Sequence, residues 1–124
     1  MPKTEVLFYQ DDDGRSPVVE WLEQLRKMDT VAYTKCAAVI TRLAEAGYEL
    51  RRPTADLLRN GIHELRAKKG RVNYRILYFF HGRNVAIVAH GMTKEDVVHP
   101  ADIERALRRK AAFEANPKKH TYRE

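Results

Sequence analysis

Hydrophobic positions in the first part of the chain recur with the period of a helix. Residues 18–25 carry apolar side chains at three- and four-residue spacing, directly after residues 16–17, a Ser-Pro pair typical of a helix start. A second stripe of the same period runs through residues 33–44, with Asp29 before it as a cap and Gly47 after it as a left-handed terminator. The pattern predicts two helices joined by a short loop into an antiparallel hairpin.

The period then shortens, and the later segments read as strands. Residues 62–68, 72–81 and 85–90 are rich in branched and aromatic side chains and are separated by short turn sequences, as in an antiparallel meander. Residues 4–9 predict one more short strand at the start of the chain. Residues 48–61 carry turn residues such as Pro and Asn-Gly, so we expect this stretch to be irregular.

A final helix is predicted to open at Pro100 and to continue through an amphipathic segment. The expected order is therefore βααβββα, an α+β fold with an antiparallel sheet, an N-terminal helical hairpin and a C-terminal helix. We expect residues 1–115 to form one domain and residues 116–124 to form a flexible basic tail.

Charge is unevenly distributed over the 124 residues, whose formal net charge is +6. Residues 1–30 are net acidic, whereas residues 59–75 and 105–123 are strongly basic. Two concentrated basic regions on a small protein favour a polyanionic partner such as nucleic acid, although a solvated basic face without a ligand has the same composition.

Several classes of protein are disfavoured by the remaining residues. The sequence has no apolar stretch long enough to span a membrane and no recognisable secretory signal, so we expect a cytoplasmic protein. Cys36, the single cysteine, lies in the second helical stripe and is expected to be a core thiol. The five histidines are scattered and no metal-binding motif is present, so neither a metal nor another cofactor is predicted.

The predicted hairpin of residues 62–68 and 72–81 gathers charged side chains on one face. Strand alternation places Glu64, Arg66 and Lys68 together, and a two-residue turn at residues 69–70 puts Glu64 opposite Arg75. Guanidinium groups at one spot suit a phosphate, because their planar fork stabilises the charge that develops when a ribose hydroxyl attacks it. The alternative is a pair of exposed strand arginines, with Glu64–Arg75 a surface pair worth about 0–1 kcal/mol.

These residues closely resemble the RelE/ParE toxin superfamily, and most of all its phage-derived, HigB-like branch. Four segments carry the likeness: 6–25, 61–80, 85–94 and 100–109. The most specific motifs are ELR at 64–66, YRILYF at 74–79, and HG at 90–91 followed by Lys94. The resemblance implies a small sheet with helices, akin to microbial ribonucleases. It also implies metal-independent cleavage of mRNA on the ribosome by 2′-hydroxyl attack, and a cognate antitoxin, often of the helix-turn-helix type.

Carried over by position, the resemblance suggests catalytic roles for Arg66, Arg75, Lys94 and His90. The basic residues expected to bind RNA are Lys68, Lys69, Arg71, Arg108 and Arg109. The match weakens after Lys94, where relatives often have a second basic residue and this chain has Glu95-Asp96.

Some superfamily members also use a tyrosine near the final helix as a proton donor. No tyrosine lies between Tyr78 and Tyr122, which leaves that role vacant or assigns it to His90 or His99. A satisfied structural histidine is the alternative for His90.

Three functions therefore remain open at the level of sequence. The first is a ribosome-dependent endoribonuclease toxin, and the second is a toxin of the ParE kind, which inhibits DNA gyrase without cutting RNA. The third is a phage-derived protein that binds nucleic acid without catalysis. Fold alone does not choose among them, because function resides in the site.

Overall fold

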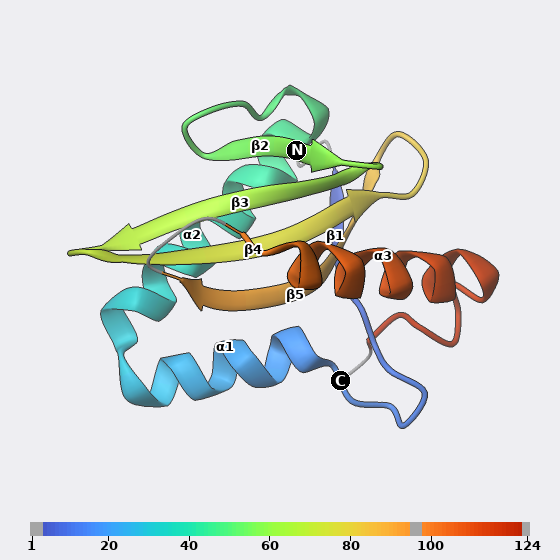
Figure 1. Cartoon of the computed structure of the whole chain (residues 1–124), viewed down its shortest axis with the longest axis horizontal. Helices are drawn as coiled ribbons and strands as arrows, with labels where there is room; N and C mark the ends of the chain where they lie inside the picture. The colour runs from blue at the N-terminus through green and yellow to red at the C-terminus, as the bar shows by residue number, and fades with distance from the viewer. Residues whose placement is uncertain (1–3, 95–97, 123–124) are drawn as a thin grey trace.

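The computed structural model describes residues 4–94 and 98–122, and within them the protein has the predicted α+β fold (Figure 1). The strands are β1 (Glu5–Phe8), β2 (Ala55–Arg59), β3 (Ile62–Lys69), β4 (Val72–Phe80) and β5 (Val85–Lys94). The helices are α1 (Pro17–Met28), α2 (Thr30–Ala46) and α3 (Pro100–Ala115), with a short 3₁₀ turn, η1 (Gly47–Glu49). The strands form one sheet in the order β1-β5-β4-β3-β2.

The helical hairpin begins at the predicted caps. The Ser16 hydroxyl accepts a hydrogen bond from the Val19 N–H at 3.3 Å, and the Asp29 carboxylate accepts one from the Ala32 N–H at 3.1 Å. Gly47 ends α2 with a φ of 54°, but its ψ of −125° lies outside the left-handed helical region that we predicted. Only glycine suits this position, because a Cβ atom there would collide with the hydroxyl of Thr4.

Residues 48–61 are more ordered than the sequence predicted. They contain η1 and the strand β2, which pairs antiparallel with β3 at the edge of the sheet. Asn60 and Gly61 both have positive φ angles, 51° and 83°, and form the tight turn between these strands. β2 was missed because its sequence, ADLLR, is short and lacks the branched residues of the other strands.

The sheet is covered on both faces, which Figure 1 shows as three layers. Helices α1 and α2 pack on one face over a core that includes Leu65, Tyr74 and Tyr78. Helix α3 packs on the other face against a second core that includes Leu77 and Phe113. Alternate residues of β3 and β4 therefore face different helices.

The last described segment of the chain packs against the end of β1 at the edge of the sheet. β1 pairs parallel with β5, so the sheet is mixed rather than purely antiparallel. Residues 116–122, expected as a loose tail, fold against this edge: Thr121 bridges Tyr9, and the Tyr122 N–H donates to the Phe8 carbonyl at 2.8 Å. Side chains such as that of Lys119 stay exposed while the backbone of this segment extends the sheet edge.

Two further expectations concern the helices. None of the helices in the described residues is both long and apolar enough to cross a membrane. Cys36 is buried in α2, and burial raises the pKa of its thiol to about 11. The thiol is therefore protonated near neutral pH, as expected of a core cysteine.

Candidate functional site

Arg66 of β3 and Arg75 of β4 lie directly opposite one another in the sheet. The turn between the strands consists of residues 70–71, so the turn predicted at residues 69–70 was one residue early. Each strand is shifted by one residue relative to the expected register, and Glu64 lies diagonal to Arg75 rather than opposite it. The shift changes the partners but not the faces, so both arginines still share the face toward α3.

The carboxylate of Glu64 joins the two arginines. Its Oε1 atom accepts hydrogen bonds from Nε of Arg66 at 2.6 Å and from Nη1 of Arg75 at 3.0 Å. The Glu64 side chain is 2% exposed, the Arg75 side chain 15% and the Arg66 side chain 37%. The Glu64–Arg75 pair is therefore buried on the carboxylate side, unlike the surface pair of the alternative interpretation, and each charge depends on the other for compensation.

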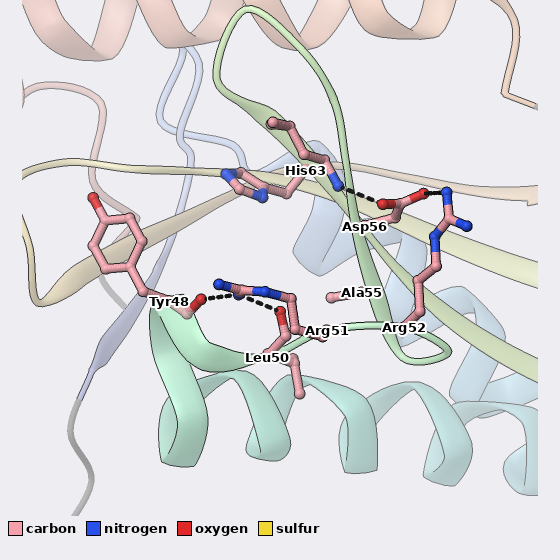
Figure 2. A pocket seen from close by; sticks show the side chains of 8 residues that line it. Tyr48, Leu50, Arg51, Arg52, Ala55, Asp56 and His63 are labelled. Atoms are coloured by element: carbon pink, nitrogen blue, oxygen red, sulfur yellow. Dashed lines mark hydrogen bonds and ion pairs between the residues drawn. The ribbon is translucent and has the colours of Figure 1, made fainter.

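Asp56 of β2 extends this arrangement toward the edge of the sheet. Its Oδ2 atom lies 3.2 Å from Nη2 of Arg66 and 2.8 Å from Nη2 of Arg52, a contact that Figure 2 shows. The hydrogen bond from Arg52 is the main cause that lowers the pKa of the Asp56 carboxyl. Charges thus alternate from Arg52 through Asp56, Arg66 and Glu64 to Arg75, and each guanidinium is oriented by a carboxylate.

One guanidinium donor beside the buried carboxylate is left unpaired in the described part of the chain. The Nε atom of Arg75 is buried and has no hydrogen-bond partner among the described residues. Arg66 and Arg75 line a cavity of about 340 Å³, which is closed on its other side by Leu58 of β2 and by Val98 and Ile103 at the start of α3. We call Glu64, Arg66 and Arg75, with this cavity, the arginine site. Glu64 also lines this open cavity, so an anion that enters it meets guanidinium N–H groups beside a carboxylate.

His90 is held at both ring nitrogens. Its Nε2 atom lies 3.1 Å from Oδ1 of Asp102, and its Nδ1 atom lies 3.4 Å from Nη1 of Arg109. Since a guanidinium only donates, Nδ1 accepts and Nε2–H donates to Asp102. Burial chiefly lowers the pKa of His90, and Arg109 lowers it further, against the opposing effect of Asp102. This geometry is that of a neutral histidine that fixes α3 to β5.

His90 nevertheless lies close to the arginine site along the sheet. Arg75 pairs with Met92 of β5, and His90 precedes Met92 by two residues on the same face. Lys94 pairs through its backbone with Asn73 at the end of β5. The Lys94 side chain, like Glu95 and Asp96, lies outside the described residues.

The basic residues of the β3–β4 hairpin separate onto different faces. Lys68 shares the face of Arg66, and both Lys68 and Arg71 are exposed. Lys69 lies on the opposite face, where its Nζ atom is 2.5 Å from Oδ2 of Asp29, the cap of α2. That bond is the main cause that lowers the pKa of Asp29. Lys69 therefore connects the hairpin to the helices and lies away from the arginine site.

Arg108 and Arg109 of α3 also differ in their surroundings. Arg108 is exposed, whereas the Arg109 guanidinium donates to the Ala89 carbonyl at 2.7 Å and lies 5.7 Å above the ring of Tyr9. Burial lowers the pKa of Arg109. Of these two predicted RNA-binding residues, only Arg108 presents its charge to solvent.

A second cavity, of about 560 Å³, lies beside η1 and β2 on the other side of Asp56 (Figure 2). Its cations are turned toward the protein: the Arg51 guanidinium donates to the carbonyl of Leu50 at 3.2 Å and to that of Tyr48, and Arg52 contacts Asp56. His63 lines this cavity, and its pKa is lowered mainly by burial. We therefore place the candidate site at the arginine site and not in this cavity.

Sequence reasoning missed three carboxylates or their roles. Alternation placed Glu64 near Arg75, but only the packing of α3 against the sheet buries it. Asp56 lies in the stretch expected to be irregular, and Asp102 contacts His90 from a different element. The alternation of the strand indicated Glu64. The roles of Asp56 and Asp102 depend on contacts between elements, which spacing along the sequence does not encode.

No group of three or more metal-ligating side chains is found among residues 4–94 and 98–122.

Comparison with known protein families gives one match that covers most of the chain. Residues 23–111 match the model of a family described as "Phage derived protein Gp49-like (DUF891)". The matched region includes α2, the whole β2–β5 meander and most of α3, and therefore every residue of the arginine site. A search of curated proteins found no match.

Proposed function

The chain belongs to the Gp49-like family of phage-derived proteins, a RelE toxin-like family, and from this premise we propose that it is the toxin of a type II toxin–antitoxin system. The proposed activity is ribosome-dependent endonucleolytic cleavage of mRNA without a metal ion. The partner that silences it is a cognate antitoxin, for which we propose the helix-turn-helix type, and the proposed location is the cytoplasm.

The observation that carries this proposal is the convergence of Arg66 and Arg75 on one buried carboxylate. Two guanidinium groups are held in fixed positions on one face, and Nε of Arg75 has no partner among the described residues. Fixed donors stabilise developing negative charge without reorganisation, and each is worth about 10²–10³ in rate by analogy with oxyanion-hole donors.

The reaction proposed at this site is an attack within the RNA chain. The ribose 2′-oxygen loses its proton and bonds to the adjacent phosphorus, and the bond from phosphorus to the 5′-oxygen breaks. The leaving oxygen takes up a proton, so the products are a 2′,3′-cyclic phosphate and a 5′-hydroxyl. Arg66 and Arg75 are proposed to bind the non-bridging oxygens, which carry most charge in the transition state.

The remaining residues have supporting roles in this proposal. Lys68, Arg71 and Arg108 are exposed and supply phosphate contacts around the site. Lys94 is the last residue of β5 and is a further proposed phosphate ligand. His90 is proposed as a positioning residue that sets α3 beside the arginine site, because both of its ring nitrogens are engaged within the protein.

One observation favours a second candidate. Glu64 and Asp56 already occupy several donors of Arg66 and Arg75, so the site is less cationic than its arginines alone suggest. A toxin of the ParE kind, which binds DNA gyrase, needs no phosphate at this position. A phage-derived protein that binds nucleic acid without cutting it is equally compatible with partly neutralised arginines.

The test is to induce the protein in cells and to map new mRNA 5′ ends with translation running and with translation blocked. The proposal expects cuts within translated frames only while ribosomes translate, and expects Arg75→Ala to remove them. Absence of cuts together with DNA damage would support gyrase inhibition. Cuts that persist when translation is blocked would contradict ribosome dependence.

A further inference from the structure

On the side of β3 that faces away from β4, strand β2 covers only half of the length of β3. β2 pairs with β3 as far as Leu65, and the Arg66 N–H then donates to the Thr54 carbonyl at 2.8 Å. From there to Lys69, β3 pairs only with β4 among the described residues. Since backbone groups alternate between the two neighbours of a strand, the N–H and C=O of Lys68 face the open side.

At the β1 edge of the sheet, part of the outer backbone is covered. There the segment 116–122 covers the end of β1, with hydrogen bonds from Tyr122 N–H to Phe8 and from Gln10 N–H to His120. An open strand edge is a template for pairing with another chain, and proteins usually cover or block it. The uncovered half of β3 therefore exposes backbone groups with which an added strand can pair.

A groove lies beside this open edge, between β3 and α2, with a volume of about 460 Å³. Its floor is apolar, formed by Val39 and Ala67. Lys35 and Arg42 stand on the α2 side, seven residues apart on one helix face, with the small side chain of Ala38 between them. We call this feature the α2–β3 groove.

The rim of the α2–β3 groove is cationic. Lys35, Arg42 and Lys68 line it, all three are exposed, and none forms an ion pair within residues 4–94 and 98–122. Arg66, which belongs to the arginine site, lines the groove as well. The groove thus combines a free strand edge, an apolar floor and a positive rim that leads to the candidate site.

We propose that the α2–β3 groove binds an extended acidic segment of a protein partner, which adds a strand to the sheet beside residues 66–69. The strand would exchange hydrogen bonds with the backbone of Lys68, and its carboxylates would lie on the α2 side of the sheet, facing Lys35 and Arg42. An extended peptide fits better than RNA, because the groove offers strand-type backbone groups and none of its lining side chains is an aromatic ring for base stacking.

This inference rests on the proposed function only in identifying the partner as the antitoxin. Because Arg66 lines both the groove and the arginine site, a bound strand would lie at the edge of that site. Docking of the partner would then also obstruct access to the site.

The test uses the full chain, ¹⁵N-labelled, and an acetylated peptide of four Glu-Val repeats as the probe. We expect chemical-shift changes centred on residues 66–69 and slower exchange of the Lys68 amide. A probe with N-methyl groups at alternate backbone positions should bind about tenfold more weakly, because it cannot complete the ladder. A Lys-Val probe should not bind, because the rim repels it.

Matched charge reversals distinguish binding in this groove from non-specific attraction of an acidic peptide to a basic protein. Lys35→Glu with Arg42→Glu should weaken binding of the Glu-Val probe about tenfold or more. The control, Lys27→Glu with Arg83→Glu, changes two exposed residues elsewhere by the same charge and should leave the affinity unchanged. Equal weakening by both pairs, or no shift at residues 66–69, overturns the inference.

Two further outcomes distinguish competing explanations. If a single-stranded oligouridylate of equal charge displaces the peptide and protects the same amide more strongly, RNA is the occupant and the inference fails. The Lys35→Glu/Arg42→Glu protein should retain cleavage of ribosome-bound mRNA. Peptide binding without any cleavage would contradict only the proposed function, whereas cleavage without peptide binding would contradict only the groove.

Discussion

Arg66 and Arg75 lie opposite one another on adjacent strands, and both guanidinium groups hydrogen-bond to the same atom, Oε1 of Glu64, at 2.6 and 3.0 Å. Two guanidinium charges held at one atom would repel each other without the buried carboxylate between them. The same carboxylate orients both groups toward one cavity. Stability and the candidate chemistry of this protein therefore depend on one shared contact.

The substitution Glu64→Gln should destabilise the fold strongly. It removes the charge that compensates both arginines while leaving the shape of the side chain, and breaking a buried pair in this way costs about 3–5 kcal/mol. The free energy of unfolding in urea measures the effect. Glu104→Gln is the control, because Glu104 is 52% exposed, lies 3.4 Å from Arg59 and should contribute about 0–1 kcal/mol. A loss for Glu64→Gln no larger than the control's would contradict a buried ion pair.

Substitution of Arg75 should abolish toxicity. Arg75→Ala removes a donor to the transition state, and Arg75→Lys keeps the charge but loses the planar fork, so both should lower the cleavage rate by about 10²–10³. Cleavage of ribosome-bound mRNA and growth arrest at matched protein levels are the measurements. Arg59→Lys, at an exposed ion pair, is the control. Growth arrest as strong as that of the unmodified protein in a well-expressed Arg75→Ala variant would exclude the enzyme as proposed.

The neighbouring arginines of α3 should respond in opposite ways. Arg109→Ala leaves the Ala89 carbonyl without its charged donor and should destabilise the protein by about 2 kcal/mol. Arg108→Ala should change stability by less than about 0.5 kcal/mol, because the side chain is exposed. It should instead lower the slope of log affinity for ribosomes against log salt by about 1. Thermal melts and salt titrations of the two variants distinguish these outcomes. A larger loss of stability for Arg108→Ala than for Arg109→Ala would contradict a structural role for Arg109 and a ligand-facing role for Arg108.

Stability should decrease as the pH falls below about 6.5. Burial lowers the pKa of His90 and of His63 below the ordinary value of 6.5, so the unfolded chain takes up these protons first. These two groups should leave the free energy of unfolding constant above pH 6.5. Between pH 6.5 and the lowered pKa of each histidine, the free energy should fall by up to about 1.4 kcal/mol per pH unit for each group. Urea unfolding from pH 8 to pH 5 measures the slope.

The histidine variants identify which group is responsible. His90→Gln should make the pH dependence shallower, and His63→Gln should do so independently, since the two lie on opposite faces of the sheet. His99→Gln changes an exposed residue and is the control. An unchanged slope in the His90→Gln protein would show that this ring is not held neutral by burial.

The sequence by itself determined the local structure and the faces. The Ser16-Pro17 pair and Asp29 begin the helices as predicted, because capping is a contact between residues three apart. The strands after residue 62 also followed from their composition. Alternation placed Arg66 and Arg75 on one face even though the predicted turn was one residue early, because a shift of one residue on both strands preserves that face.

Only the tertiary structure decided the environment of these residues. The sheet register, the strand β2 and the parallel pairing of β1 with β5 bring together segments far apart in the chain, which no local pattern encodes. Burial of Glu64 requires α3 to cover the sheet, and engagement of Lys69 by Asp29 requires the hairpin to meet the helices. Charge counted along a sequence does not show which cations are already paired, because ion pairing depends on distances set by packing.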